Sequence, residues 1–363
     1  MNKKITFLIS SLSGGGAEAV CVNIANGLAS RGWDVTLVVL HTKNSAYHDR
    51  VSQKVNLKVL EVSNARYSLV ALRNYVKTQK PTQIVVFNYE LAVIMVFVRM
   101  ITFEKFTLIA RNISILSQKK QLTSGIWYKY IVRAFIDKFY IQADHIINQC
   151  EAMREDILQL YSLDRSKTSV IYNPVNELVQ NYVTKYGVEN KKENYFLCVG
   201  RLESVKAFHY AIEAFANVSS EMSHMRLKIL GKGSLEPKLK ELANRLGIAH
   251  KVDFEGFQKD VLPYYTRAYA TLLTSLYEGF PNVLIESITL GTPVVAFDCP
   301  GGTKEIVQDG VNGYLVEYQN MSDLKCKMKE VINKKWDSAE VANSATRFSL
   351  DIALDRWEKL LGE

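Results

Sequence analysis

The chain has 363 residues, with 45 Lys and Arg against 37 Asp and Glu, and a pI near 9.0. Because 48% of the residues are hydrophobic and only 23% are charged, the chain can bury substantial cores, which excludes disorder and fibrous repeats and, at this length, predicts two domains. The cysteines are odd in number and widely spaced, which excludes a disulfide framework and a zinc cluster and favours a reducing cytoplasm; they are Cys21, Cys150, Cys198, Cys299 and Cys326.

The first half begins with a strand, a glycine loop, a helix and a second strand. The strands are expected over 5–10 and 35–40, and the helix over 17–30, where Arg31-Gly32 ends it. Five further strands alternate with helix-length segments, over 57–62, 84–87, 107–110, 145–148 and 169–172. This order is typical of a doubly wound parallel sheet, the Rossmann-like class of α/β domain.

A domain boundary is expected at Tyr172–Asn176, because Pro174 disfavours helix before it and a polar, lysine-rich segment follows. The second half repeats the scheme, with helices over 206–219 and up to Leu246, and strands over 195–199, 227–230, 252–255, 270–274, 292–297 and 313–316. We therefore expect two Rossmann-like domains, 1–176 and 177–345. A terminal helix over about 346–363 has one apolar face and is expected to pack back on the first domain.

No segment has the length of a membrane span. The longest apolar run, Leu91–Val98, stops at Arg99 after eight residues, whereas a spanning helix needs about 20. The apolar stretch after the first lysines is also too short for a signal peptide.

Two loops, each between a strand and the following helix, carry residues suited to anion binding. Gly14, Gly15 and Gly16 stand between a strand and a helix, where amide groups can hold a phosphate; a tight turn is the alternative. At the corresponding loop of the second half, Arg201 ends a strand and Lys206 starts a helix, so that both can neutralise a diphosphate unless they are ordinary solvated charges.

Among the candidate ligand-binding segments, residues 275–286 have the most specific pattern. Pro281 suits the first turn of a helix, so Glu278 lies in the loop before it and Glu286 lies more than one turn inside it. A buried glutamate on an apolar helix face needs strong hydrogen bonds, which ribose hydroxyls can donate. The backbone from Gly279 to Val283 could hold a phosphate or a sugar hydroxyl; this stretch comprises Gly279, Phe280, Pro281, Asn282 and Val283. Two unrelated surface glutamates are the alternative.

Six motifs in this order resemble the retaining family 4 glycosyltransferases of the GT-B fold, in particular those of bacterial surface polysaccharides. They are Gly-Arg-Leu-x-x-x-Lys at 200–206, Gly-x-Gly at 231–233, Tyr-Glu-Gly-Phe-Pro-Asn-Val-Leu-Ile-Glu at 277–286, Leu-Gly-Thr-Pro-Val-Val-Ala at 290–296, Gly-Gly-Thr-Lys-Glu-Ile-Val at 301–307 and Asp-Gly-x-Asn-Gly-Tyr-Leu-Val at 309–316. The match is dense over residues 195–317 and weaker but collinear before them.

The resemblance implies a role for each motif residue. Arg201 and Lys206 would hold the diphosphate of a nucleotide-sugar and stabilise the leaving group, Glu286 would bind the ribose, and Glu278 would orient the donor sugar. Gly15 and Gly16 would approach the donor from the first domain, and the backbone at Phe257 and Gln258 would face the base. Because no Asp-x-Asp occurs in the chain, we expect no metal and no other cofactor, with the nucleotide-sugar as substrate.

The sequence departs from the family at two places. Ala207 replaces a glycine that often follows the lysine, and the first domain has no clear equivalent of a histidine that often stands near the reacting sugar. Arg111 and Asn112 end the corresponding strand and are candidates for acceptor or donor contact, with a salt bridge as the alternative for Arg111.

The positive charge lies in one half. Residues 1–176 hold 22 Lys and Arg against 12 Asp and Glu, an excess that charge alone cannot assign to nucleic acid, lipid or a small anion. The segment 126–141 and the apolar stretch 91–103 suggest a face that lies on anionic lipid, with a solvated helix face as the alternative. The basic residues of this face are Lys119, Lys120, Lys129, Arg133 and Lys138. Such a face suits a polyprenyl-diphosphate-linked glycan acceptor on the inner side of the cytoplasmic membrane.

Together these features predict a cytoplasmic, peripheral-membrane glycosyltransferase that moves a hexose or N-acetylhexosamine from a nucleotide-sugar, expected to be UDP-linked, to a lipid-linked saccharide of O-antigen or capsule type. A same-fold nucleotide-sugar epimerase or hydrolase is the nearest alternative. A nucleotide-dependent oxidoreductase lacks the dinucleotide fingerprint here, and a nucleic-acid binder lacks any recognisable motif.

Overall fold

The computed structural model describes residues 3–43, 45–118, 133–188 and 192–362, without the side chains of 133–136. The chain divides into two compact units, Met1–Asn176 with Leu350–Glu363, and Glu177–Ser349. The first division coincides with the boundary expected after residue 176. The chain returns to the first unit at Leu350, four residues later than expected from the sequence.

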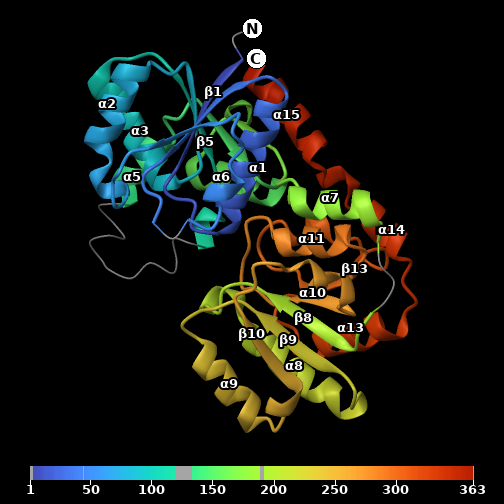
Figure 1. Cartoon of the computed structure of the whole chain (residues 1–363). Helices are drawn as coiled ribbons and strands as arrows, with labels where there is room; N and C mark the ends of the chain where they lie inside the picture. The colour runs from blue at the N-terminus through green and yellow to red at the C-terminus, as the bar shows by residue number, and fades with distance from the viewer. Residues whose placement is uncertain (1–2, 44, 119–132, 189–191, 363) are drawn as a thin grey trace. The chain divides into compact units, whose positions relative to one another are not determined.

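The first unit is built on a parallel sheet of seven described strands in the order β3-β2-β1-β4-β5-β6-β7 (Figure 1). Its strands are β1 (Lys4–Ile9), β2 (Asp34–Val39), β3 (Asn56–Val59), β4 (Gln83–Val86), β5 (Thr107–Arg111), β6 (His145–Asn148) and β7 (Thr168–Val170). The central strands are apolar runs because helices cover both faces of the sheet. In register, Phe7 of β1 lies between Leu37 of β2 and Val85 of β4.

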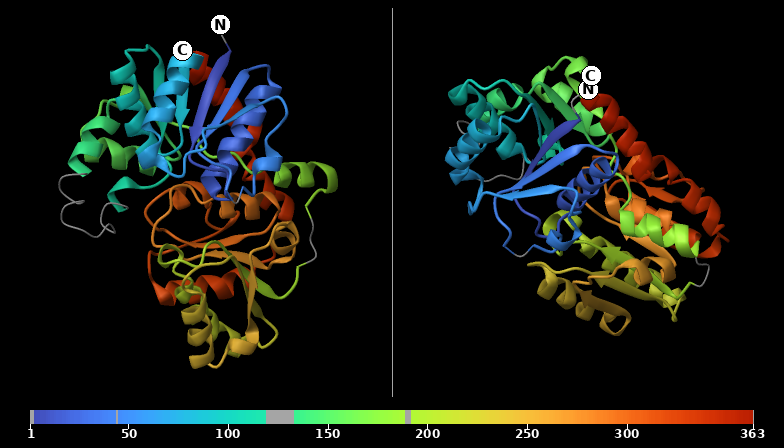
Figure 2. Two further views of the ribbon diagram at one scale, coloured as in Figure 1. Left: turned by 60° about the vertical axis from the view of Figure 1, so that its left-hand side comes forward. Right: turned by 45° about the horizontal axis from the view of Figure 1, so that its top comes forward.

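Two hydrophobic clusters cover the two faces of this sheet. Helices α1 and α15 lie on one face, and α2, α3, α5 and α6 lie on the other (Figures 1 and 2). The helical segments of this unit are α1 (Gly16–Ser30), η1 (His48–Arg50), η2 (Ala65–Tyr67), α2 (Leu69–Gln79), α3 (Tyr89–Thr102), α5 (Arg133–Tyr140), α6 (Glu151–Tyr161), η4 (Arg165–Lys167) and α15 (Leu350–Gly362).

The expectation that the stretch 91–103 faces lipid is wrong for most of its length. Leu91, Met95 and Val98 of α3 are fully buried against the sheet and its neighbouring helices. Their apolar character therefore reflects the core of the unit. Among the described residues no helix is long and apolar enough to cross a bilayer.

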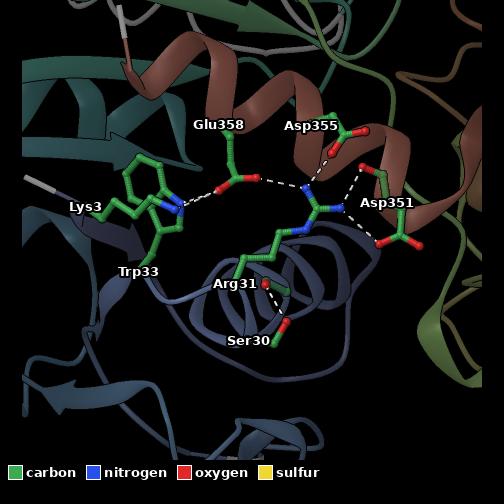
Figure 3. Close-up of polar contacts among 8 residues, drawn as sticks. Lys3, Ser30, Arg31, Trp33, Asp351, Asp355 and Glu358 are labelled. Carbon is green, nitrogen blue, oxygen red and sulfur yellow. Dashed lines mark hydrogen bonds and ion pairs between the residues drawn. The ribbon is translucent and has the colours of Figure 1, made fainter. Parts of the chain in front are cut away.

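The terminal helix α15 packs on α1, as the sequence predicted, and a charged cluster fixes it there (Figure 3). The guanidinium of Arg31, just after α1, donates hydrogen bonds to Asp351, Asp355 and Glu358 at 3.0, 2.6 and 3.0 Å. The indole N–H of Trp33 donates to Glu358 at 2.8 Å. Three carboxylates of one helix thus hold a single arginine at the end of another.

The second unit has a parallel sheet of six described strands in the order β10-β9-β8-β11-β12-β13. They are β8 (Tyr195–Val199), β9 (Arg226–Leu230), β10 (Val252–Gly256), β11 (Ala270–Leu273), β12 (Val294–Phe297) and β13 (Gly313–Val316). The surrounding segments are α7 (Glu177–Tyr186), η5 (Ser204–Lys206), α8 (Phe208–Glu221), α9 (Glu236–Arg245), η6 (Ala249–Lys251), α10 (Leu262–Arg267), α11 (Asn282–Thr289), α12 (Thr303–Ile306), α13 (Met321–Asn333), α14 (Ser338–Asn343) and η7 (Thr346–Phe348).

In both sheets the strand order reverses once, next to the first strand of the unit. The reversal lies between β1 and β4 in the first unit, and between β8 and β11 in the second. Loops that leave two neighbouring strands in opposite directions open a crevice at the carboxyl edge, where doubly wound domains bind their ligands. The strand order therefore predicts that the second unit binds its ligand at the loops after β8 and β11.

Candidate active site

The loops after β8 and β11 are joined by hydrogen bonds at the carboxyl edge of the second sheet. The amide of Leu276 donates to the carbonyl of Val205 at 2.8 Å. The hydroxyl of Thr274 lies 3.3 and 3.2 Å from the carbonyl oxygens of Lys206 and Ala207. These contacts fix the backbone that carries Lys206 against the backbone that carries Glu278.

Lys206 and Glu278 form an ion pair in this position. The Nζ of Lys206 lies 2.5 Å from the Oε1 of Glu278, and the two side chains are only 19% and 14% exposed. The sequence predicted that both residues serve one ligand, and the structure brings them into direct contact. Glu278 Oε2 has no hydrogen-bond or ion-pair partner among the described residues, so it can accept a hydrogen bond from a ligand hydroxyl.

Two residues of this arrangement were not singled out from the sequence. The buried hydroxyl of Ser275 donates to the same Oε1 of Glu278 at 2.6 Å, and the buried Thr274 holds the Lys206 backbone. Both lie in the four residues before Glu278, and polar side chains directly after a buried strand are the signal that could have found them.

A third loop, after β12, supports Glu278 from the other side. The amide of Glu278 donates to the Pro300 carbonyl at 3.0 Å, and the amide of Gly302 donates to Gly279 at 2.9 Å. Gly301 has a φ of +130°, and a Cβ added there would lie 1.9 Å from the carbonyl oxygen of Glu278. Only glycine allows so close an approach in this conformation.

The cysteine of the same loop is poorly suited to act as a nucleophile. Burial raises the pKa of the Cys299 thiol to about 12, although its hydrogen bond with Thr303 opposes that shift. A thiol with so high a pKa carries little thiolate at neutral pH. All five cysteines lie in the described residues, and no two of them form a disulfide there.

Lys206 does not start a helix as expected. It ends the short 3-10 segment η5, and α8 begins only at Phe208, because Ala207 takes the left-handed conformation with φ 45° and ψ 41°. The break turns the chain sharply between the lysine and the helix. The alkyl part of Lys206 crosses Gly200, where an added Cβ would lie 3.2 Å from the lysine Cε.

Arg201 precedes this turn and is exposed. Its side chain makes no hydrogen bond or ion pair with the described residues, while its positive charge lowers the pKa of Tyr277 against the stronger effect of burial. The loop after β9 packs closely against the residue before Arg201. A Cβ added at Gly231, with φ +133°, would lie 1.9 Å from the Gly200 carbonyl oxygen. Arg201 is therefore a free cation beside the Tyr277–Glu278 segment.

The helix after this segment starts as the sequence predicted. Pro281 is the N-cap residue of α11, Glu278 stands in the loop before it and Glu286 lies in the second turn. Glu286 is half-buried and accepts a hydrogen bond from the hydroxyl of Tyr265 at 3.2 Å, and burial raises the pKa of that tyrosine well above its usual value. A half-buried carboxylate with a fixed orientation is suited to bind a diol.

One member of the predicted anion-binding stretch cannot serve as expected, because Pro281 has no N–H to donate. The side chain of Phe280 is buried edge-on against Phe348, but the prediction concerned its backbone amide, which stays a candidate. The amides of Asn282 and Val283 lie at the start of α11 and that of Gly279 in the loop just before it, and they stay candidates as well. In the loop after β10, Phe257 is 62% exposed and the side chain of Gln258 donates to the Glu255 carbonyl at 2.6 Å.

In the first unit, Gly15 is the N-cap residue of α1 and both Gly15 and Gly16 are exposed. The carboxylate of Glu18 lies against this helix start, since a Cβ at Gly15 would come within 2.4 Å of Glu18 Oε2. An acidic side chain already interacts with the helix dipole here. An anionic ligand would have to displace it.

Arg111 is not placed to contact an acceptor. Its side chain is 1% exposed, enclosed by the rings of Phe87 and Trp357, and its Nη2 donates to the Ile171 carbonyl and to Asn173. No carboxylate pairs with it among the described residues, so the salt-bridge alternative is also wrong. Burial lowers the pKa of this guanidinium to about 9.

Asn112 is equally enclosed, at 3% exposed, and its side chain donates to Asn148 at 3.1 Å. Its role in this structure is to join the ends of β5 and β6. Of the expected lipid-facing residues, Lys119, Lys120, Lys129 and the side chain of Arg133 lie outside the described residues, while Lys138 is exposed near the end of α5. Within the described ranges, no group of three or more His, Cys, Asp or Glu could hold a metal ion.

Comparison with known proteins gives the same division of the chain. Residues 184–348 match the family model described as "Glycosyl transferases group 1", and residues 14–177 match "Glycosyltransferase Family 4". These ranges fall within the two units of the structure, apart from residue 177.

Two curated relatives take part in polysaccharide or glycan assembly. The amylovoran biosynthesis glycosyltransferase AmsD of Erwinia amylovora is 25% identical over 99% of both chains. The N-acetylgalactosamine-N,N'-diacetylbacillosaminyl-diphospho-undecaprenol 4-alpha-N-acetylgalactosaminyltransferase of Campylobacter jejuni is 30% identical over 66% of this chain and 67% of its own. Among solved structures, Anabaena HepE in complex with UDP-glucose aligns over 99% of both chains with a TM-score of 0.77 at 20% identity.

Proposed function

Because the chain belongs to the family 4 and group 1 glycosyltransferases of GT-B fold and is related to enzymes of polysaccharide biosynthesis, we propose that it transfers a hexose or N-acetylhexosamine from a UDP-sugar to a lipid-linked saccharide. The second unit would bind the donor and the first unit the acceptor. The observation that carries the proposal is the Lys206–Glu278 ion pair at the carboxyl edge of the second sheet.

The charges of this site suit a nucleoside diphosphate. Arg201 is exposed and Lys206 is held by a single carboxylate, so both can turn to the phosphate oxygens. The amide groups of Gly279, Asn282 and Val283 would add donors at the start of α11. Glu286, oriented by Tyr265, would bind the ribose hydroxyls, and Phe257 and Gln258 would lie near the base.

Glu278 would bind hydroxyls of the donor sugar once Lys206 turns to the phosphate. In the reaction an acceptor hydroxyl oxygen forms a bond to the anomeric carbon, and the bond from that carbon to the diphosphate oxygen breaks with its electron pair. Arg201 and Lys206 stabilise the charge that develops on this oxygen, which also takes the acceptor proton. Attack from the side of the leaving group retains the anomeric configuration.

The lipid-linked acceptor and the UDP donor rest on what similar proteins bind. The name of the Campylobacter relative specifies a diphospho-undecaprenol-linked acceptor, and the HepE structure holds UDP-glucose. An enzyme with such an acceptor would work at the inner face of the cytoplasmic membrane without crossing it. We propose the same location for this chain.

The donor assignment is tested by melting and hydrolysis measurements with UDP-, GDP- and ADP-sugars. We expect a UDP-sugar to raise the melting temperature of the wild-type protein and to be slowly hydrolysed. Glu286→Ala should abolish most of the shift, whereas Glu213→Ala, which alters a half-buried glutamate on α8, should leave it unchanged. No response to any nucleotide-sugar would refute the proposal, and an equal shift for Glu286→Ala would refute the ribose assignment.

We further propose that the reaction needs no metal ion, because Arg201 and Lys206 provide the positive charge that a cation would otherwise supply. Activity should persist after treatment with EDTA. Loss of activity with EDTA and its recovery with Mg²⁺ or Mn²⁺ would show that this part of the proposal is wrong.

A further inference from the structure

The guanidinium of Arg111 is buried at the end of β5 with part of its hydrogen-bonding capacity unused. Its Nη2 donates to the Ile171 carbonyl at 3.2 Å and to Asn173 Oδ1 at 2.8 Å. Its Nε and Nη1 are also buried, and neither has a partner among the described residues. Because buried N–H groups in proteins nearly always have an acceptor, two orphaned nitrogens on one side chain require an explanation.

The indole of Trp357 on α15 adds a third unused donor to the same cluster. This side chain is fully buried, and the centroid of its ring lies 5.3 Å from the guanidinium carbon of Arg111. Its Nε1 is buried and has no partner among the described residues, whereas Trp33 donates its indole N–H to Glu358. The core between β5 and α15 therefore contains three donor nitrogens that no described acceptor meets.

The positive charge of Arg111 is also unpaired. No carboxylate contacts it among the described residues, and Glu358, which follows Trp357 on α15, is held by Arg31. The thiol of Cys21 on α1 is close enough to act on the guanidinium, but burial raises the pKa of that thiol, so it stays protonated and carries no charge. With a pKa of about 9 the guanidinium itself stays protonated at neutral pH. A buried cation without a counterion is costly.

We propose that a small monovalent anion, such as chloride, binds beside Arg111 and Trp357 in the core of the first unit. An anion only accepts hydrogen bonds, so it can take all three N–H groups and balance the single positive charge. A water molecule would also have to donate two hydrogen bonds. In this unit the partnerless acceptor Oε1 of Gln83 lies at the opposite edge of the sheet, where β4 begins.

The proposed anion would fasten three segments of the first unit to one another. Arg111 already joins the end of β5 to Ile171 and Asn173, which precede the boundary between the units. Trp357 belongs to α15, which the chain adds to the unit last. A ligand bound by both side chains would therefore stabilise the docking of α15 on the sheet. This role needs neither donor nor acceptor, so its test is independent of the proposed function.

The test compares the melting temperature of the full chain in sodium chloride and in sodium gluconate at equal ionic strength. Both salts screen charges equally, but gluconate is too large to be enclosed beside side chains that are 1% and 0% exposed. We expect chloride to raise the melting temperature of the wild type by at least about 3 °C over gluconate. Crystals grown in bromide should show an anomalous-scattering peak within hydrogen-bond distance of the Arg111 guanidinium.

Three variants distinguish this site from a general effect of salt. Arg111→Met should abolish the difference between the two salts, and Trp357→Phe, which keeps an aromatic ring but removes the N–H, should reduce it. Arg50→Met is the matched control, because Arg50 also stacks on a ring of the first unit, that of Tyr47, but is only half-buried. It should respond to chloride as the wild type does.

The bromide experiment uses the wild type, so it decides the question even where Arg111→Met does not fold. Absence of a bromide peak at Arg111 would overturn the proposal and would indicate that water alone meets these donors. Equal melting temperatures of the wild type in the two salts, or a chloride effect that persists in Arg111→Met, would overturn it as well.

Discussion

Lys206 and Glu278, which follow the adjacent strands β8 and β11, neutralise each other across 2.5 Å at the reversal point of the second sheet. Both side chains are mostly buried, and an unpaired charge in such a place is costly. In the proposed reaction the donor diphosphate takes the lysine and the donor sugar takes the glutamate. The pair would thus keep both side chains ionised and in place before the donor enters.

Ser275 should act as a positioning residue for Glu278. Because its hydroxyl fixes Oε1 of Glu278 at 2.6 Å, Ser275→Ala should lower kcat about tenfold with little change in KM, and Ser275→Thr should restore most of it. The control is Ser287→Ala, which removes an equally buried hydroxyl that donates to Thr292 in the same unit. Steady-state kinetics with the accepted donor distinguish the two; equal losses would assign Ser275 a purely structural role.

Gly301 should be needed for activity as well as for stability. In Gly301→Ala the new Cβ collides with the carbonyl of Glu278, so the loop must move and activity should fall about 100-fold. Gly310→Ala is the matched control, because Gly310 also has a positive φ, +75°, but a Cβ added there would come no closer than 3.9 Å to a described atom, the Nζ of Lys334. That control should lose about 1 kcal/mol of stability and keep its activity. Similar activities would contradict this account of the loop.

Ala207 is expected to carry local strain that glycine would relieve. Its left-handed backbone, with φ 45°, is unfavourable for an L side chain, so Ala207→Gly should raise the free energy of unfolding by up to about 1 kcal/mol. Ala207→Val should lower it, because a β-branched side chain tolerates this conformation least. Urea denaturation measures both changes. A destabilised glycine variant would show that the alanine is not strained.

The attachment of α15 should depend on pH through Glu358. The hydrogen bond from Trp33 and the charge of Arg31 hold the pKa of Glu358 below its usual 4.5, so its contribution is present above that pH and is lost as the pH falls further. Glu358→Gln should cost about 1 kcal/mol at neutral pH. Thermal unfolding followed by tryptophan fluorescence should show the gap between variant and wild type closing in acid. A gap independent of pH would contradict this.

The architecture could be predicted from the sequence because apolar runs and turn residues specify the strands directly. All thirteen described strands overlap the expected segments. The stretch 91–103 was misread because periodicity alone does not distinguish a helix buried in a core from one that faces lipid.

The sequence predicted which residues form the site better than it predicted how they are arranged. Motif order identified Lys206, Glu278 and Glu286, but no pattern shows that Lys206 and Glu278 pair before a ligand binds. Sequence spacing also placed Lys206 on a helix that begins two residues later, because the left-handed turn at Ala207 has no signature in an alanine. Arg111 was misplaced because an arginine at the end of a strand is usually exposed, whereas Trp357, distant in sequence, covers this one.

The most direct test of the account is a calorimetric titration of UDP into the wild type, Lys206→Met and Glu278→Gln. Lys206→Met should weaken binding at least about 30-fold, since the diphosphate loses one of its two cations and meets an unpaired Glu278. Glu278→Gln should bind UDP as tightly as the wild type or more tightly, because the carboxylate no longer competes for the lysine. Lys327→Met, which breaks a 2.8 Å pair with Glu330 on α13, should change nothing. Unchanged UDP affinity in Lys206→Met would contradict the central claim that this lysine passes from Glu278 to the donor diphosphate.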